Sequence, residues 1–133
     1  MKNPKIYKQA WKRLFETHER RLSATSGGWD VESQAACQAL GEYKLHCFAE
    51  RLIYEYASPW RDLTQDEAIS LYLINQHHWT LEQARVLKPE DQLLVLHREL
   101  LELKLDRTEG TPVLQWLGLD VPSGDLAAHF EAP

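Results

Sequence analysis

Apolar residues recur every three or four positions along much of this chain, which is the spacing of one face of an α-helix. No stretch alternates apolar and polar residues between turn signals, as a half-buried strand would. We therefore predict an all-α fold, a compact bundle of about five helices with an irregular C-terminal segment. The expected helices span residues 4–24, 31–58, 65–76, 81–87 and 89–106, with short turns at 112–118 and 124–130.

Helix start signals are clear in the middle of the chain. Thr64 is followed three positions later by Glu67, and Thr80 by Gln83, which is the spacing of a capping box. Pro89 is placed as the first residue of the next helix, where its missing N–H costs nothing. These signals predict three helix starts independently of the hydrophobic pattern. Asp30 and Ser123 are expected to cap the second helix and the last turn, and Ser58-Pro59 is expected to end the second helix. The residues at 107–112 and 118–124 are instead the most similar to linkers.

The first helix has an apolar side and a cationic side. On a helical wheel Tyr7, Trp11 and Phe15 fall on the apolar side, and His18 falls there too. The cations could contact a protein partner or nucleic-acid phosphates, or they could be solvated and paired on the surface with Glu16. The cations that form this candidate contact surface are Lys5, Lys8, Lys12, Arg13, Arg20 and Arg21.

Charge is distributed unevenly between this helix and the rest of the chain. Residues 1–24 carry a net charge of +5, whereas the other 109 residues carry −10. Such a separation orients binding partners, and the acidic remainder disfavours nucleic acid because it repels phosphate. The basic helix could equally lean on the acidic body of its own chain.

The predicted fifth helix is unusually rich in leucine. Residues 93–105 contain seven leucines, which cover an arc of about 200°, although a helix on a core needs little more than about 100°. We expect this helix to be central in the bundle. The alternative is that one side of it meets a second molecule, as in a homodimer through Leu93–Leu105. His97 lies within this arc, and we expect it to be a neutral, hydrogen-bonded core residue.

Histidines and carboxylates elsewhere give weak signals for chemistry. Glu42, His46 and Glu50 form an i, i+4, i+8 stripe that could hold a divalent metal, although a charged surface stripe is the favoured interpretation. His77 and His78 break the chain between two helices. We assign no catalytic residue, no cofactor and no metal ligand, and the sequence leaves open whether these five residues have a role beyond structure.

Two cysteines and the absence of long apolar runs bear on the compartment. Cys37 and Cys47 fall in one predicted helix, about 15 Å apart, which is too far for a disulfide. Free thiols favour a reducing compartment, so we expect a cytoplasmic protein. No apolar run reaches the ~20 residues of a membrane span, so no membrane association is expected. At this length we expect a single helical domain over residues 1–133.

These observations favour a small, non-catalytic protein that binds another protein, as an adaptor, an inhibitor or a regulatory module. The apolar tail around Trp116 either seals the core or docks into that partner. The first alternative is a nucleic-acid-binding regulator that uses the basic first helix. The second alternative is a metal-binding protein or hydrolase that uses histidine and glutamate side chains on the helices.

Overall fold

A computed structural model describes residues 3–25, 31–119 and 124–131, and within them it confirms the all-α prediction. Extended pairing in these residues is limited to two isolated bridges, Ser58 with Arg61 and Leu105 with Phe130. The elements are α1 (Pro4–Thr25), α2 (Val31–Glu55), α3 (Gln65–His77), α4 (Leu81–Arg85), α5 (Pro89–Val95), α6 (His97–Glu102), α7 (Arg107–Trp116) and the 3-10 helix η1 (Gly124–His129).

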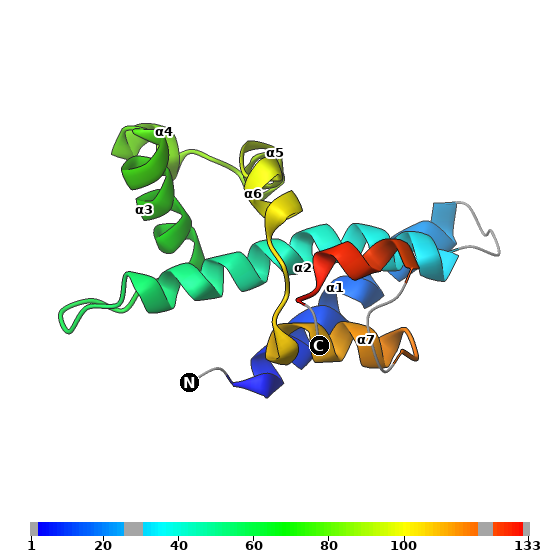
Figure 1. Cartoon of the computed structure of the whole chain (residues 1–133). Coiled ribbons are helices and arrows are strands. Elements are labelled where there is room, and N and C mark those ends of the chain that lie inside the picture. Colours follow the sequence, from blue (N-terminus) through cyan, green and yellow to red (C-terminus); the bar gives the residue numbers. More distant parts are fainter. Residues whose placement is uncertain (1–2, 26–30, 120–123, 132–133) are drawn as a thin grey trace.

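The long helix α2 is the axis of the molecule, with α1 and α7 packed on one side and α3 to α6 on the other (Figure 1). Two clusters of buried apolar residues share this helix. The first joins the N-terminal half of α2 to α1, to α7 and to the C-terminal segment. The second joins its C-terminal half to α3, α5 and α6. The central helix is therefore α2, and the expectation that residues 89–106 form the central helix is wrong.

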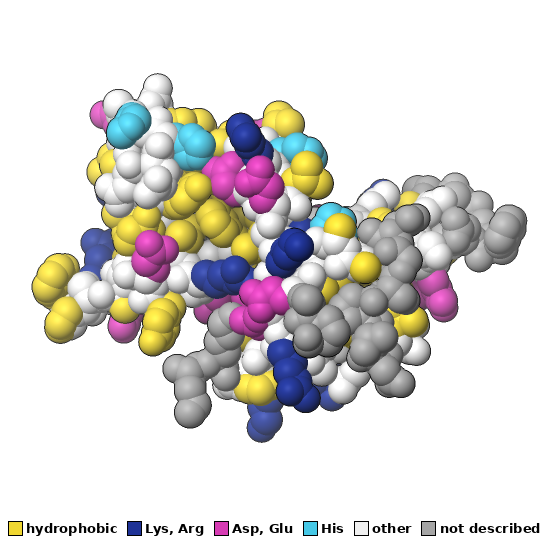
Figure 2. Space-filling view, viewed as in Figure 1, with side chains coloured by type: hydrophobic (Ala, Val, Ile, Leu, Met, Phe, Trp, Pro, Cys, Tyr) yellow, Lys and Arg dark blue, Asp and Glu magenta, His cyan; other side chains and the backbone are white. Residues whose placement is uncertain are grey.

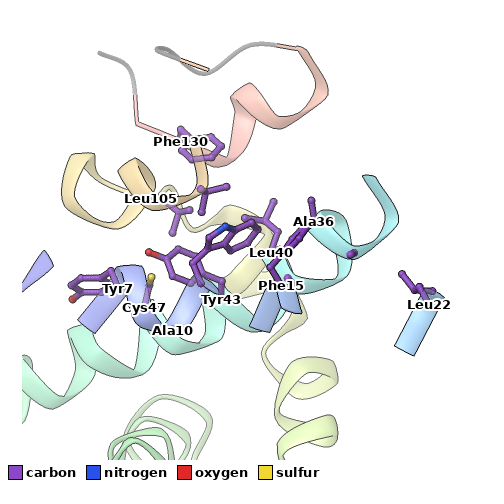
Figure 3. Packing of buried hydrophobic residues seen from close by; sticks show 14 residues of the cluster. Tyr7, Ala10, Phe15, Leu22, Ala36, Leu40, Tyr43, Cys47, Leu105 and Phe130 are labelled. Atoms are coloured by element: carbon purple, nitrogen blue, oxygen red, sulfur yellow. The ribbon is translucent and has the colours of Figure 1, made fainter. Parts of the chain in front are cut away.

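Aromatic rings of α1 and α2 form the middle of the first cluster (Figure 3). Trp11 is 1% exposed, and its ring centroid lies 5.5 Å from that of Tyr43 in an edge-on arrangement and 6.0 Å from that of Phe15. Tyr7 and Leu22 are buried in the same cluster. The apolar side predicted for the first helix is thus confirmed as the side that packs on α2.

Both predicted capping boxes are present. The Thr64 hydroxyl accepts from the backbone N–H of Glu67, and the Thr80 hydroxyl accepts from that of Gln83, each at 3.2 Å. His78 ends α3 in the left-handed conformation, with φ 58°. The helix before this region, α2, ends at Glu55, earlier than the Ser58–Pro59 signal predicts. The caps expected at Asp30 and Ser123 lie outside the described residues.

The expected helix over residues 89–106 is broken into α5 and α6 and ends at Glu102. Leu96 joins the two pieces with φ −96° and ψ 14°, outside helical geometry. Near its end, Leu105 pairs through its backbone with the C-terminal segment, and this tertiary pairing replaces further helical hydrogen bonds. The buried positions of these two helices are Gln92, Leu96 and Leu100, which share one face, and His97 lies outside that face. His97 is exposed, so its expected place in the core is wrong.

Helix α7 begins where a linker was expected. Asp106 accepts a hydrogen bond from the backbone N–H of Glu109 at 2.9 Å, and the Glu109 carboxylate accepts from the backbone N–H of Asp106 at 3.0 Å. This third capping box starts the helix at Arg107, and Pro112, expected near the start of a short turn, lies inside α7. The sequence carries the signal for this helix start as Asp106-x-x-Glu109, which has the spacing of a capping box.

Candidate functional site

The six cations selected from the sequence are all exposed on α1, but they do not share one environment. Lys12 lies 4.0 Å from the Glu16 carboxylate, as predicted for a surface pair. Arg21 donates to Gln38 on α2 and lies 3.2 Å from His18 Nδ1. Arg13 lines a hollow between α1, α2, α3 and α5. The remaining three cations, Lys5, Lys8 and Arg20, are exposed on α1 as well.

Trp116, the remaining residue selected from the sequence, lies at the end of α7 against α1. Its ring centroid is 4.9 Å from that of Phe15, and the side chain is about half exposed. A shallow hollow of about 380 Å³ adjoins it, and Glu19 and Glu32 also line that hollow. Trp116 thus partly seals the first cluster, and its neighbours here include acidic residues.

An apolar groove of about 560 Å³ separates the first turns of α1 from the C-terminal half of α2. Ile6 and Tyr7 line it from α1, and Ile53 and Tyr54 line it from α2. Tyr54 is 79% exposed, although it stands beside this apolar surface. The groove was not predicted, because the hydrophobic pattern of one helix does not reveal the space between two.

A second exposed aromatic residue stands close to this groove along the chain. Ala57 is the last residue that lines the groove, and Trp60 follows it in the turn closed by the Ser58–Arg61 bridge. Trp60 is 85% exposed. In Figure 2, hydrophobic side chains gather at the end of α2 that leads into α3. A tryptophan in a turn after a helix stop was the signal that could have marked this surface.

The stripe Glu42, His46 and Glu50 is engaged in contacts between helices. The Glu42 carboxylate is 2.9 Å from His18 Nε2 on α1. Gln65 on α3 lies 2.8 Å from His46 Nδ1 and donates to Glu50 at 3.0 Å. Burial lowers the pKa of His46, so its imidazole is neutral at neutral pH. Nowhere in the described ranges do three or more histidine, cysteine or acidic side chains gather as metal ligands.

The histidine pair between α3 and α4 has a structural explanation. His77 Nε2 lies 2.8 Å from the Glu99 carboxylate on α6. Burial raises the pKa of Glu99, but hydrogen bonds from His77, from its own backbone N–H and from Tyr72 outweigh burial and leave it below its ordinary value. His78 supplies the left-handed residue that ends α3. These contacts fix the turn between the two helices.

Charged groups that the sequence pattern did not mark lie buried or half-buried between α2 and the C-terminal third of the chain. The guanidinium of Arg51 donates to the Glu109 carboxylate through Nε at 2.9 Å and through Nη2 at 2.5 Å. Tyr43 donates its hydroxyl proton to the backbone carbonyl of Glu109. Lys44 is 3% exposed and donates to the carbonyl of Leu100 at 2.8 Å. Sequence position on a helix did not indicate that these charges are covered.

Comparison with protein-family models, curated proteins and solved structures finds no significant match to this chain. In the part of the chain that the structure describes, none of the helices combines the length and the apolar character that crossing a bilayer requires. Contacts, burial and charge of the chain's own residues therefore carry the functional conclusion.

Proposed function

We propose that this chain is a small, non-catalytic module that binds another protein through the apolar groove between α1 and α2. The observation that carries the proposal is the exposure of two aromatic residues, 79% for Tyr54, which lines the groove, and 85% for Trp60, which lies in the turn three residues after the lining residue Ala57. Tryptophan and tyrosine are enriched among the residues that dominate binding energy at protein interfaces. Trp11 is 1% exposed and contributes to the core, whereas Trp60 at 85% exposure contributes almost no packing to this fold.

The occupant that fits this surface is a segment of a partner protein that carries apolar anchors beside acidic side chains. The apolar anchors match the groove walls formed by Ile6 and Ile53. The acidic side chains match Lys5 and Lys8, which are exposed on the same turns of α1 as Ile6. Charge complementarity of this kind raises the association rate and suppresses wrong partners.

A reducing, cytoplasmic setting is part of the proposal. Cys37 is exposed and Cys47 is buried, both as free thiols on α2. An exposed free thiol persists most readily where glutathione keeps thiols reduced. In that setting the module would act as an adaptor, inhibitor or regulatory subunit.

The test compares capture of partners by three purified forms of the chain. The double variant Tyr54→Ser/Trp60→Ser removes the two aromatic groups. The control Val86→Ser/Leu94→Ser removes two apolar groups of similar exposure, 78% for Val86, directly after α4, and 76% for Leu94 on α5. Proteins retained from lysate are identified by quantitative mass spectrometry. The partner is then purified, and its affinity for each form is measured by calorimetry.

We expect the partner to bind wild type and the control alike, and to lose about thirtyfold or more in affinity for the aromatic variant, since a dominant interface residue contributes about 2 kcal/mol or more. Reversal of charge in Lys5→Glu/Lys8→Glu should weaken binding, most strongly at low salt. A partner that binds all three forms equally, or the absence of any retained protein, would refute the groove as the binding surface. If the chain forms a homodimer through Leu93–Leu105, the variant Val86→Ser/Leu94→Ser should lose that dimer, whereas Tyr54→Ser/Trp60→Ser should keep it.

A nucleic-acid-binding regulator is the second candidate, supported by the exposure of Lys5, Lys8, Lys12 and Arg20 along α1. Binding by these cations would release counterions, so the affinity should fall steeply between ~50 and ~200 mM salt. Fluorescence anisotropy with labelled single- and double-stranded DNA and RNA measures this directly. No binding at ~50 mM salt removes the candidate.

A further inference from the structure

The C-terminal residues 124–131, which comprise η1, Phe130 and Glu131, lie on the surface formed by α2 and α7 (Figure 1). Their backbone pairs with a single residue of the chain before α7. The N–H of Leu105 donates to the carbonyl of His129, and the N–H of Glu131 donates to the carbonyl of Leu105, both at 2.9 Å. We call residues 124–131 the C-terminal strap.

Phe130 anchors the C-terminal strap on α7. Its side chain is buried in the first cluster beside Leu105 (Figure 3). A Cβ built on Gly110 of α7 would lie 2.8 Å from Cδ1 of Phe130, closer than real Cβ contacts occur. The ring therefore rests directly on the backbone of α7, and only glycine at position 110 leaves room for it.

His129 connects the strap to the buried lysine of α2. Its Nδ1 lies 2.8 Å from Nζ of Lys44, and the same ammonium donates to the carbonyl of Leu100. An ammonium group has donors and no acceptor, so Nδ1 must accept. The imidazole in the docked strap is therefore neutral, with its proton on Nε2.

The surrounding elements offer His129 no compensating negative charge within the described contacts. Burial lowers the pKa of His129, and the charge of Lys44 lowers it further. The carbonyl of Leu100 on α6 accepts from the same ammonium, and Arg51 of α2 and Glu109 of α7 form an ion pair with each other. The side chains of Lys104, next to the strap partner Leu105, and of Glu131, in the strap itself, are exposed.

We propose that the C-terminal strap is a pH-sensitive closure, docked while His129 is neutral and released when His129 takes up a proton from solvent. A protonated Nδ1 cannot accept the hydrogen bond of Lys44, and it places a second cation 2.8 Å from the ammonium. Release of the strap removes the Phe130 side chain from its contact with α7 and exposes Leu105, Gly110 and the Lys44 amine.

The direction of the pH dependence follows from linkage. The pKa of His129 is lower in the docked state than in the released state, so the released state binds more protons below about pH 6.5. Docking is therefore strongest at neutral pH and above, and it weakens as the pH falls below that value. A difference of one pKa unit corresponds to about a tenfold change in the docking equilibrium.

The experiment measures hydrogen exchange by NMR at two backbone amides of the intact chain, those of Leu105 and Glu131, between pH 7.5 and 4.5. Both donate the hydrogen bonds that hold the strap. After correction for the intrinsic pH dependence of exchange, we expect protection of both amides to fall about tenfold or more, with the midpoint at which the His129 ring resonances titrate. Amides in the middle of α2 should keep their protection.

The matched variant is His129→Gln, which retains an acceptor for Lys44 but does not titrate. Its two amides should stay protected down to pH 4.5. Constant protection in wild type, or an equal fall in wild type and His129→Gln, would overturn the proposal. Coincidence of the amide and ring titrations in wild type tests the same claim without any substitution, so the result does not depend on how well the variant folds.

Discussion

Arg51 on α2 donates two hydrogen bonds to the carboxylate of Glu109 on α7, and the Glu109 side chain has no exposed surface. Arg51 also donates to the carbonyl of Lys104 at 2.7 Å. A buried carboxylate is costly unless it is paired and fully hydrogen-bonded. The pair therefore fixes where α7 begins relative to α2, and the strap docks on the surface that results.

Removal of one partner should destabilise the fold more than removal of both charges. We expect Arg51→Met to lower the free energy of unfolding by about 3–5 kcal/mol, because Glu109 then keeps a buried charge without its partner. The double variant Arg51→Met/Glu109→Gln should recover part of this loss, since glutamine keeps the capping hydrogen bonds without the charge. Urea denaturation of the single and double variants measures the difference. Equal stability of the two would show that the charge is not what matters.

The two helical glycines should respond in opposite directions to the same substitution. Gly110→Ala on α7 places a methyl group against the Phe130 ring and should cost about 1–3 kcal/mol of stability. Gly41→Ala on α2 meets nothing within 4 Å and should stabilise by about 0.5–1 kcal/mol through helix propensity. Thermal and urea unfolding of both variants provide the comparison. A neutral Gly110→Ala would mean that the strap does not sit on α7 as described.

Lys44 should make the stability depend on pH on the alkaline side. Burial lowers the pKa of Lys44 to about 8, from an ordinary value of 10.5. The unfolded chain therefore binds more protons between these values, and the free energy of unfolding should rise with pH in that range. From pH 7.5 to 9.5 we expect wild type to gain about 1–2 kcal/mol relative to Lys44→Met. Urea denaturation at several pH values gives both slopes, and parallel slopes would contradict the buried ammonium.

Local sequence was sufficient for the features that depend on neighbours within one helix. The apolar side of α1 around Trp11, and the capping boxes at Thr64 and Thr80, were predicted because side chains three or four positions apart meet on one face or one turn. The capping box at Asp106 carried the same kind of signal. Fold class and the exposure of the α1 cations follow from this short-range periodicity.

Tertiary structure alone decided what depends on distant partners. The chain leaves the helix before Leu105 because the C-terminal strap supplies backbone partners there, from residues more than twenty positions away. Lys44 and Glu109 are buried because His129 and Arg51 reach them across helices, which no pattern within one helix records. The groove beside Tyr54 likewise arises from the angle at which two helices pack. Burial and cavities are properties of pairs of elements, and a single-helix pattern contains no information about the second member of the pair.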